Sequence, residues 1–119
     1  MKKYNLDDMN QELQFSFEGR DYILRCNLCV LDAVLEQCGG DLEAAFDVSA
    51  PSKSVMVWLA AMMNDYAEDQ NWLDYVPYTA KQLGKRISPR NRELISDVMS
   101  LVTRSLVPAG AQDADQTGD

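Results

Sequence analysis

The sequence predicts an α+β protein, mostly α, in which an N-terminal β-hairpin packs on a small bundle of four to five helices. Three observations carry this prediction. The segment 13–25 alternates apolar and polar residues on both sides of a glycine turn. Apolar residues then recur at helical spacing in several later segments. Residues that begin or end helices bound those segments, and a chain of 119 residues is expected to form one domain.

The hairpin is expected over 13–25, with its turn at Glu18-Gly19. The alternation places Ile23 on one face of the hairpin. It places five large apolar side chains on the opposite face: Leu13, Phe15, Phe17, Tyr22 and Leu24. An isolated hairpin is only marginally stable in water, so this face must pack on the helices that follow.

Two short helices are expected next, at about 28–38 and 41–47. Asn27 is the candidate N-cap of the first, and Gly39 follows it where a glycine relieves the left-handed turn. Asp41 can cap the second helix. The apolar faces are Leu31, Val34, Leu35 and Cys38 in the first helix, and Leu42, Ala45 and Phe46 in the second.

A central helix is expected at about 53–68, capped by a serine of the loop 48–54. Its apolar stripe is Val55, Trp58, Leu59, Met62 and Tyr66, widened by Met56, Val57, Ala60, Ala61 and Met63. Such a helix either forms the middle of the core or presents a second face to a partner, for which methionines are adaptable. The residues predicted to contact that partner are Met56, Trp58, Met63 and, from the next segment, Trp72.

The connection after this helix is rich in aromatic residues, and Trp72, Tyr75 and Tyr78 either cover the core or mark a contact patch. Thr79 and Gln82 have the spacing of a capping box, which predicts a helix at 80–86. Ser88-Pro89 opens the last helix, 89–107. Its buried side is predicted to be Leu94, Ile95, Val98, Val102 and Leu106. The single globular domain is therefore 13–107, between an N-terminal arm (1–12) and a disordered tail (108–119).

No catalytic chemistry is apparent in the chain. It has no histidine, the commonest general base, and no glycine-rich phosphate-binding motif. Cys26 and Cys29 form a C-x-x-C pair that could be a redox or metal site, but with Cys38 as the third and last cysteine a four-ligand zinc site cannot be completed. We expect buried apolar cysteines, no cofactor and no enzymatic activity. No apolar segment is long enough to span a membrane and no signal peptide is apparent, so a cytoplasmic protein is expected.

Charge is unevenly distributed. The stretch 26–52 has five acids and no base, whereas 80–92 has five bases and no acid: Lys81, Lys85, Arg86, Arg90 and Arg92. One interpretation is head-to-tail self-assembly of copies, and the other is a pair of solvated faces. The basic stretch also resembles a helix-turn-helix in its Ala80-x-x-x-Gly84 spacing, but Arg90 stands where an apolar residue is required. With a net charge of −8, binding to nucleic acid is disfavoured.

Three stretches together resemble the tail assembly chaperones of long-tailed bacteriophages and prophages. They are "FEGRDYILRCNLCVLDAVLEQCGG", "VWLAAMMNDYAED" and "YTAKQLGKRISPRN", and the resemblance covers roughly Leu13 to Leu106. It implies a non-enzymatic assembly factor that binds the tape measure protein in many copies and recruits tail tube protein. It also implies a location in the cytoplasm of the bacterial host and absence from the mature virion. The alternatives are a small phage-encoded DNA-binding regulator and a structural connector that stays in the virion.

Overall fold

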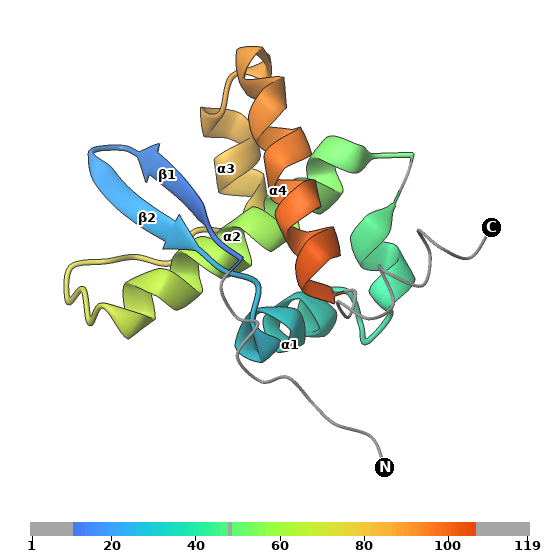
Figure 1. Ribbon diagram of the computed structural model, residues 1–119, viewed down its shortest axis with the longest axis horizontal. Helices are drawn as coiled ribbons and strands as arrows, with labels where there is room; N and C mark the ends of the chain where they lie inside the picture. The colour runs from blue at the N-terminus through green and yellow to red at the C-terminus, as the bar shows by residue number, and fades with distance from the viewer. Residues whose placement is uncertain (1–10, 48, 107–119) are drawn as a thin grey trace.

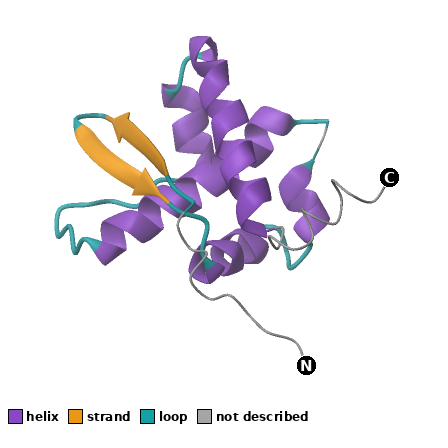
Figure 2. Ribbon diagram, viewed as in Figure 1, coloured by secondary structure: helices purple, strands orange, loops and turns teal. Residues whose placement is uncertain are grey.

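The computed structural model describes residues 11–47 and 49–106 and confirms the predicted fold class (Figure 1; Figure 2). The elements in order are β1 (Leu13–Phe17), β2 (Arg20–Leu24), α1 (Leu28–Gln37), the 3-10 helix η1 (Leu42–Phe46), α2 (Pro51–Asp69), α3 (Ala80–Arg86), the 3-10 helix η2 (Pro89–Asn91) and α4 (Arg92–Leu106). The predicted tail and all of the predicted arm except Gln11 and Glu12 lie outside the described residues.

Helix α2 is the centre of the molecule. It contacts β2, α1, η1, α3 and α4, and the other elements surround it in Figure 1. Its residues Trp58, Leu59 and Met63 are completely buried. The wide apolar surface of this helix is therefore accounted for by the core of the protein itself, which was the first of the two interpretations of its sequence.

The hairpin has the predicted face and turn. Leu13 pairs with Leu24 and Phe15 with Tyr22, which places these side chains together on the face toward α2. Glu18 and Gly19 both have positive φ, as the two-residue turn that suits the twist of a hairpin requires. Tyr22 and Leu24 are buried almost completely, so β2 is the strand that joins the core.

Both ends of α1 follow the sequence signals. The Asn27 side chain accepts a hydrogen bond from the Val30 amide at 2.9 Å. At the other end Gly39 has a φ of +66°, and the Gly40 amide donates to the Leu35 carbonyl at 2.7 Å, as in a Schellman motif. The buried face differs from the prediction, because Val30 and Val34 are its centre while Leu31, Leu35 and Cys38 are only partly buried.

The start of α2 corrects a prediction. The helix begins at Pro51 rather than at Lys53, with Ala50 at the N-cap position and no side chain capping it. Proline at the first helical position has no N–H and its φ already suits a helix, so it can begin α2 without a serine at the N-cap. Ser54 instead accepts a hydrogen bond from the Asp47 amide at 3.0 Å, which ties the end of η1 to α2.

The C-terminal half is also close to prediction. The Thr79–Gln82 capping box opens α3, and Ser88 caps the following turn with Pro89 at its first position. This turn is a short 3-10 helix, so the last α-helix starts at Arg92. Val98 and Val102 are buried as predicted, and Leu101 joins them because it occupies the same side of α4.

Candidate protein-binding surfaces

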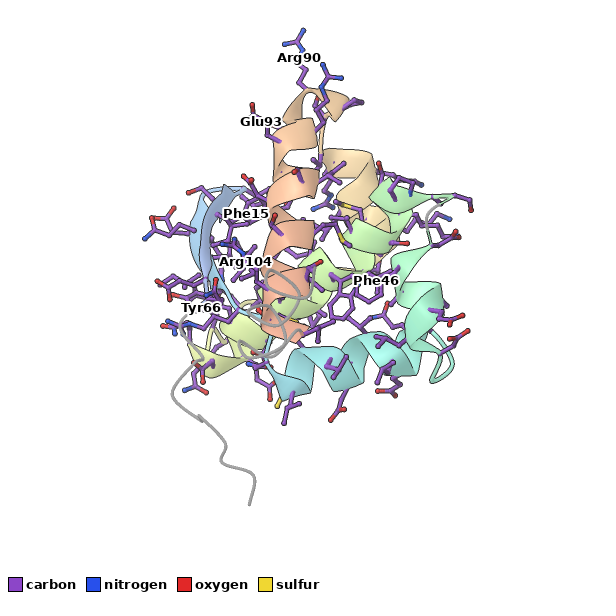
Figure 3. The ribbon with its side chains drawn as sticks, turned by 45° about the vertical axis from the view of Figure 1, so that its right-hand side comes forward. Phe15, Phe46, Tyr66, Arg90, Glu93 and Arg104 are labelled. Atoms are coloured by element: carbon purple, nitrogen blue, oxygen red, sulfur yellow. The ribbon has the colours of Figure 1, made fainter. Side chains whose placement is uncertain are left out.

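The structure places the four predicted contact residues in three different surroundings. Trp58 and Met63 are completely buried, so their assignment as partner contacts is corrected to a structural role. The indole of Trp58 donates to the Ala45 carbonyl at 3.0 Å, and Figure 3 shows Phe46 of η1 directed toward the same interior. Met56 is nearly buried but lines a hollow at the surface. Trp72 is partly buried in the segment after α2.

The segment 70–79, hereafter the 70–79 loop, leaves α2 in a fixed direction. Asn71 has a φ of +57°, and its amide donates to the Glu68 carbonyl at 3.0 Å. The Trp72 amide donates to the Ala67 carbonyl at 3.2 Å. These two bonds form a Schellman motif with asparagine in the left-handed position, which turns the chain back over the end of α2.

The side chain of Asn64 in α2 forms hydrogen bonds with Tyr75 and Tyr78 of the loop. Its amide nitrogen donates to the Tyr78 carbonyl at 2.9 Å, and its amide oxygen accepts from the Tyr78 backbone N–H at 3.0 Å and from the Tyr75 hydroxyl at 2.6 Å. One side chain thus satisfies three groups of a segment that has no regular secondary structure. The loop is consequently ordered although it is a connection on the surface.

Aromatic rings fill the space between this loop, the hairpin and α2. Trp72 lies 5.4 Å from Tyr22 and 5.7 Å from Tyr66, measured between ring centroids, in edge-to-face contacts. Phe17 at the hairpin tip meets Tyr78 in the same geometry at 5.5 Å. Such edge-to-face pairs each add to the stabilisation that comes from burial. We call the six rings the aromatic cluster: Phe17, Tyr22, Tyr66, Trp72, Tyr75 and Tyr78.

Two arginines form ion pairs beside the cluster: Arg20 joins the hairpin to the 70–79 loop, and Arg86 joins α3 to the hairpin. The guanidinium of Arg20 lies 4.6 Å from the centroid of the Trp72 ring and forms an ion pair with Asp74 at 2.6 Å. Arg86 forms an ion pair with Glu18 at 2.9 Å. The hydrogen bond from Tyr78 and the neighbouring Arg86 lower the pKa of Glu18, and Arg20 lowers the pKa of Asp74.

The result is an open cleft of about 260 Å³ between the hairpin tip, the loop and α3. We call it the aromatic cleft; its lining includes Phe17, Glu18, Arg20, Tyr22, Asp74, Tyr75, Val76, Pro77, Tyr78, Gln82 and Arg86. The loop also carries the most exposed large apolar side chains of the described residues, Leu73 at 99% and Val76 at 76%. The loop therefore holds two apolar side chains in water on a backbone that is already ordered.

Replacing Asn64 with leucine is expected to release the loop. The substitution keeps the size of the side chain but leaves the Tyr75 hydroxyl and two backbone groups of Tyr78 without a partner, at a cost of about 2 kcal/mol in the free energy of unfolding. Hydrogen exchange of the Tyr78 amide should become much faster. Asn64→Asp, which keeps both acceptor bonds, should have a smaller effect. Equal protection of this amide in wild type and Asn64→Leu would disprove this role.

Alkaline pH is expected to destabilise the cluster. Burial, and next the hydrogen bond to Glu18, raise the pKa of Tyr78 to about 12, and burial also raises the pKa of Tyr75. Because an unfolded tyrosine ionises near pH 10, the stabilisation is complete below about pH 10 and is lost as pH rises toward 12. Urea midpoints measured across this interval should fall, and Tyr78→Phe should reduce the slope. A slope unchanged by Tyr78→Phe would contradict the assignment.

The five basic residues of the predicted charged patch are all exposed: Lys81, Lys85, Arg86, Arg90 and Arg92. Figure 3 shows Arg90 projecting from the tip formed by the turn between α3 and α4. Arg86 is engaged with the hairpin, whereas the other four form no ion pair with any described residue. Helix α1, which carries part of the acidic stretch, lies at the far end of the molecule from this tip (Figure 1). The charge separation in the sequence is thus also a separation in space.

The three cysteines lie in different surroundings, and Cys26 and Cys29 of the C-x-x-C motif differ in exposure. Cys26 is buried, Cys38 is partly buried and Cys29 is exposed, so the expectation of buried cysteines is wrong for Cys29. Burial raises the pKa of the Cys26 thiol to about 11, which disfavours the thiolate needed for redox or metal chemistry. Within residues 11–47 and 49–106, no three acidic or cysteine side chains converge on a possible metal site. Of the helices described, none combines the length and the apolar character that crossing a bilayer requires.

No model of a known protein family matches this chain, and no curated protein or solved structure is significantly similar to it. The assignment of these surfaces to protein binding is therefore based on the sequence and structure of this chain alone. Sequence reasoning identified Trp72, Tyr75 and Tyr78 but missed Leu73 and Val76 between them. It also missed Arg20, which alternation in the hairpin marks only as a polar residue beside the turn.

Proposed function

We propose that this protein is a non-enzymatic tail assembly chaperone of a long-tailed phage or prophage, which binds the tape measure protein and recruits tail tube subunits. The observation that supports the proposal most strongly is the aromatic cleft together with the exposed side chains of Leu73 and Val76 on the 70–79 loop. The resemblance of the sequence to such chaperones supplies the identity of the partners.

The composition of this surface suits protein binding. The residues that dominate binding energy in protein interfaces are mainly tryptophan, tyrosine and arginine. The aromatic cluster contains Trp72 and Tyr75, and the guanidinium of Arg20 lies over both rings. Because the loop is already held by hydrogen bonds from Asn64, binding would lose little conformational entropy. Leu73 and Val76 supply apolar area that has no use within the described fold.

The proposed mode of action needs repetition rather than chemistry. Many copies along a long helical client would shield its apolar side chains until tail tube protein displaces them. The segregated charge of this chain would favour one orientation of neighbouring copies over the reverse. We place this action in the host cytoplasm, with the protein absent from the finished virion.

Co-expression with the tape measure protein of the same phage tests the proposal. We expect the two proteins to purify together, the client to stay soluble only in the presence of the chaperone, and mass spectrometry of purified particles to find no chaperone. Failure to keep the client soluble would contradict the proposal. Detection in particles would favour the structural connector.

The alternative, a DNA-binding regulator, is favoured by one observation, the exposed basic tip around Arg90. Phosphate binding by this tip would weaken steeply as salt increases. A gel shift over a range of salt concentrations separates the alternatives. A salt-sensitive shift at micromolar protein would support the regulator, and the absence of any shift would exclude it.

A further inference from the structure

A second surface feature is a hollow of about 450 Å³ between the N-terminal half of α2 and helix α3. We call it the apolar hollow; its lining is Ser52, Lys53, Met56, Val57, Ala80, Lys81 and Gly84. Its wall is almost entirely apolar, since the two lysines contribute their methylene stems and keep their ammonium groups in water. Ala80 and Gly84 are one helical turn apart, so they leave the backbone of α3 open to close approach.

Gly84 has no evident purpose within the described fold. It lies inside α3 without a left-handed backbone, and a Cβ placed there would meet only the Met56 side chain, at 4.0 Å. A glycine inside a helix costs about 1 kcal/mol relative to alanine. The fold would accept alanine, so the glycine is better explained by another chain that approaches this face of α3.

The charges around the hollow specify its occupant. Lys53 and Lys81 are exposed on its rim, no acidic residue lines it, and neither lysine forms an ion pair with a described residue. The hollow therefore favours an apolar side chain that has carboxylates beside it. Coulomb attraction at this exposed rim would select the orientation of the occupant more than add affinity.

The outer face of α1 has this character. Leu28 is 75% exposed, and Asp32 and Glu36 follow it one and two turns later on the same face. Neither carboxylate forms an ion pair with a described residue. Helices α1 and α3 both pack on α2 but do not contact each other, and they lie on opposite sides of it (Figure 1). One chain cannot bring its own α1 face into its own hollow.

We propose that the apolar hollow receives helix α1 of a second copy of this chain, with Leu28 in the hollow and Asp32 and Glu36 beside Lys53 and Lys81. The contact joins two different surfaces, so in a dimer one copy keeps its α1 face free and the other keeps its hollow free, and further copies can add in the same direction. This inference rests on the multiple-copy part of the proposed function and specifies its surface.

Sedimentation velocity over a range of protein and salt concentrations tests the contact. The wild type should form concentration-dependent oligomers whose association weakens modestly as salt increases. Gly84→Leu, which fills the hollow, and Leu28→Asn should each stay monomeric. Thr103→Leu, which places the same leucine side chain on the exposed side of α4, should leave the oligomers unchanged. Gly84→Ala should weaken association and also raise Tm by about 3–6 °C, because the helix gains stability.

Mixing two variants that have each lost one of the two contact surfaces gives a more specific test. Gly84→Leu retains an intact α1 face and Leu28→Asn retains an intact hollow, so an equimolar mixture should form a 1:1 dimer that cannot grow. Reversing Lys53 and Lys81 to glutamate should abolish association, and adding Asp32→Lys and Glu36→Lys in the same chain should restore it. Reversing Arg90 and Arg92 to glutamate changes the net charge equally but away from the hollow, and should have no effect.

Several results would overturn this proposal. The first is a wild type that is monomeric at every concentration, and the second is an equimolar mixture of Gly84→Leu and Leu28→Asn that remains monomeric. The third is a loss of oligomers when Arg90 and Arg92, but not Lys53 and Lys81, are changed to glutamate. A monomeric wild type whose Gly84→Leu variant also loses the tape measure protein would assign the hollow to the client. In contrast, failure to bind the client with the dimerisation results intact would overturn the proposed function and leave this contact standing.

Discussion

Met63→Asp is expected to prevent folding. Met63 is completely buried in the middle of α2, the helix that β2, α1, η1, α3 and α4 all contact. A carboxylate there must be either desolvated without a partner or protonated, and the lost packing adds to that cost. We expect a loss of about 5 kcal/mol or more in the free energy of unfolding, comparable with the whole stability of a small domain. Circular dichroism should show no cooperative unfolding transition.

Met63→Leu is the matched control for this prediction. It conserves apolar character and approximate volume, so it should cost less than about 1.5 kcal/mol and keep a cooperative transition. A folded Met63→Asp variant with a Tm near that of the wild type would contradict the central position of α2. It would also reopen the assignment of this side of the helix to a partner.

The paired change Leu73→Asp and Val76→Asp is expected to weaken client binding strongly without affecting the fold. Both side chains are exposed, so the free energy of unfolding should change by no more than about 0.5 kcal/mol for each. Removing one dominant contact of an interface costs about 2 kcal/mol or more, which corresponds to at least about 30-fold in Kd. The measurement is the Kd for the tape measure protein, together with the urea midpoint.

A control for added charge is needed, because the protein is already acidic. Thr103→Asp with Ser100→Asp adds the same charge to the exposed side of α4 and should leave the Kd within about twofold, since surface charges contribute little at a distance. If both pairs weaken binding equally, net charge rather than the aromatic cleft controls the interaction.

Local signals in the sequence predicted much of the fold. The hairpin turn at Glu18-Gly19, the cap at Asn27 and the Thr79 capping box each depend on residues within a few positions of one another. Helix spacing also identified the central element, α2, because its apolar residues cover most of its circumference. These features are encoded locally, so a single sequence suffices to find them.

The candidate surfaces depended instead on long-range geometry. Apolar character alone cannot separate Met63, which is buried, from Leu73, which is exposed, because both are followed by polar residues in the chain. What distinguishes them is the Schellman motif at Asn71 and the bonds from Asn64, which fix the direction of each loop side chain. The partners of Arg20 and Arg86 are likewise more than fifty positions away in the sequence.

Site-specific photocrosslinking in phage-producing cells tests the central claim most directly. A photoreactive amino acid at position 73 is compared with the same residue at position 104, on the exposed side of α4. The proposal predicts a covalent adduct with the tape measure protein from position 73 and none from position 104. An adduct that forms from position 104 but not from 73, or no protein adduct from 73 during tail assembly, would contradict the claim that the 70–79 loop is the client-binding surface.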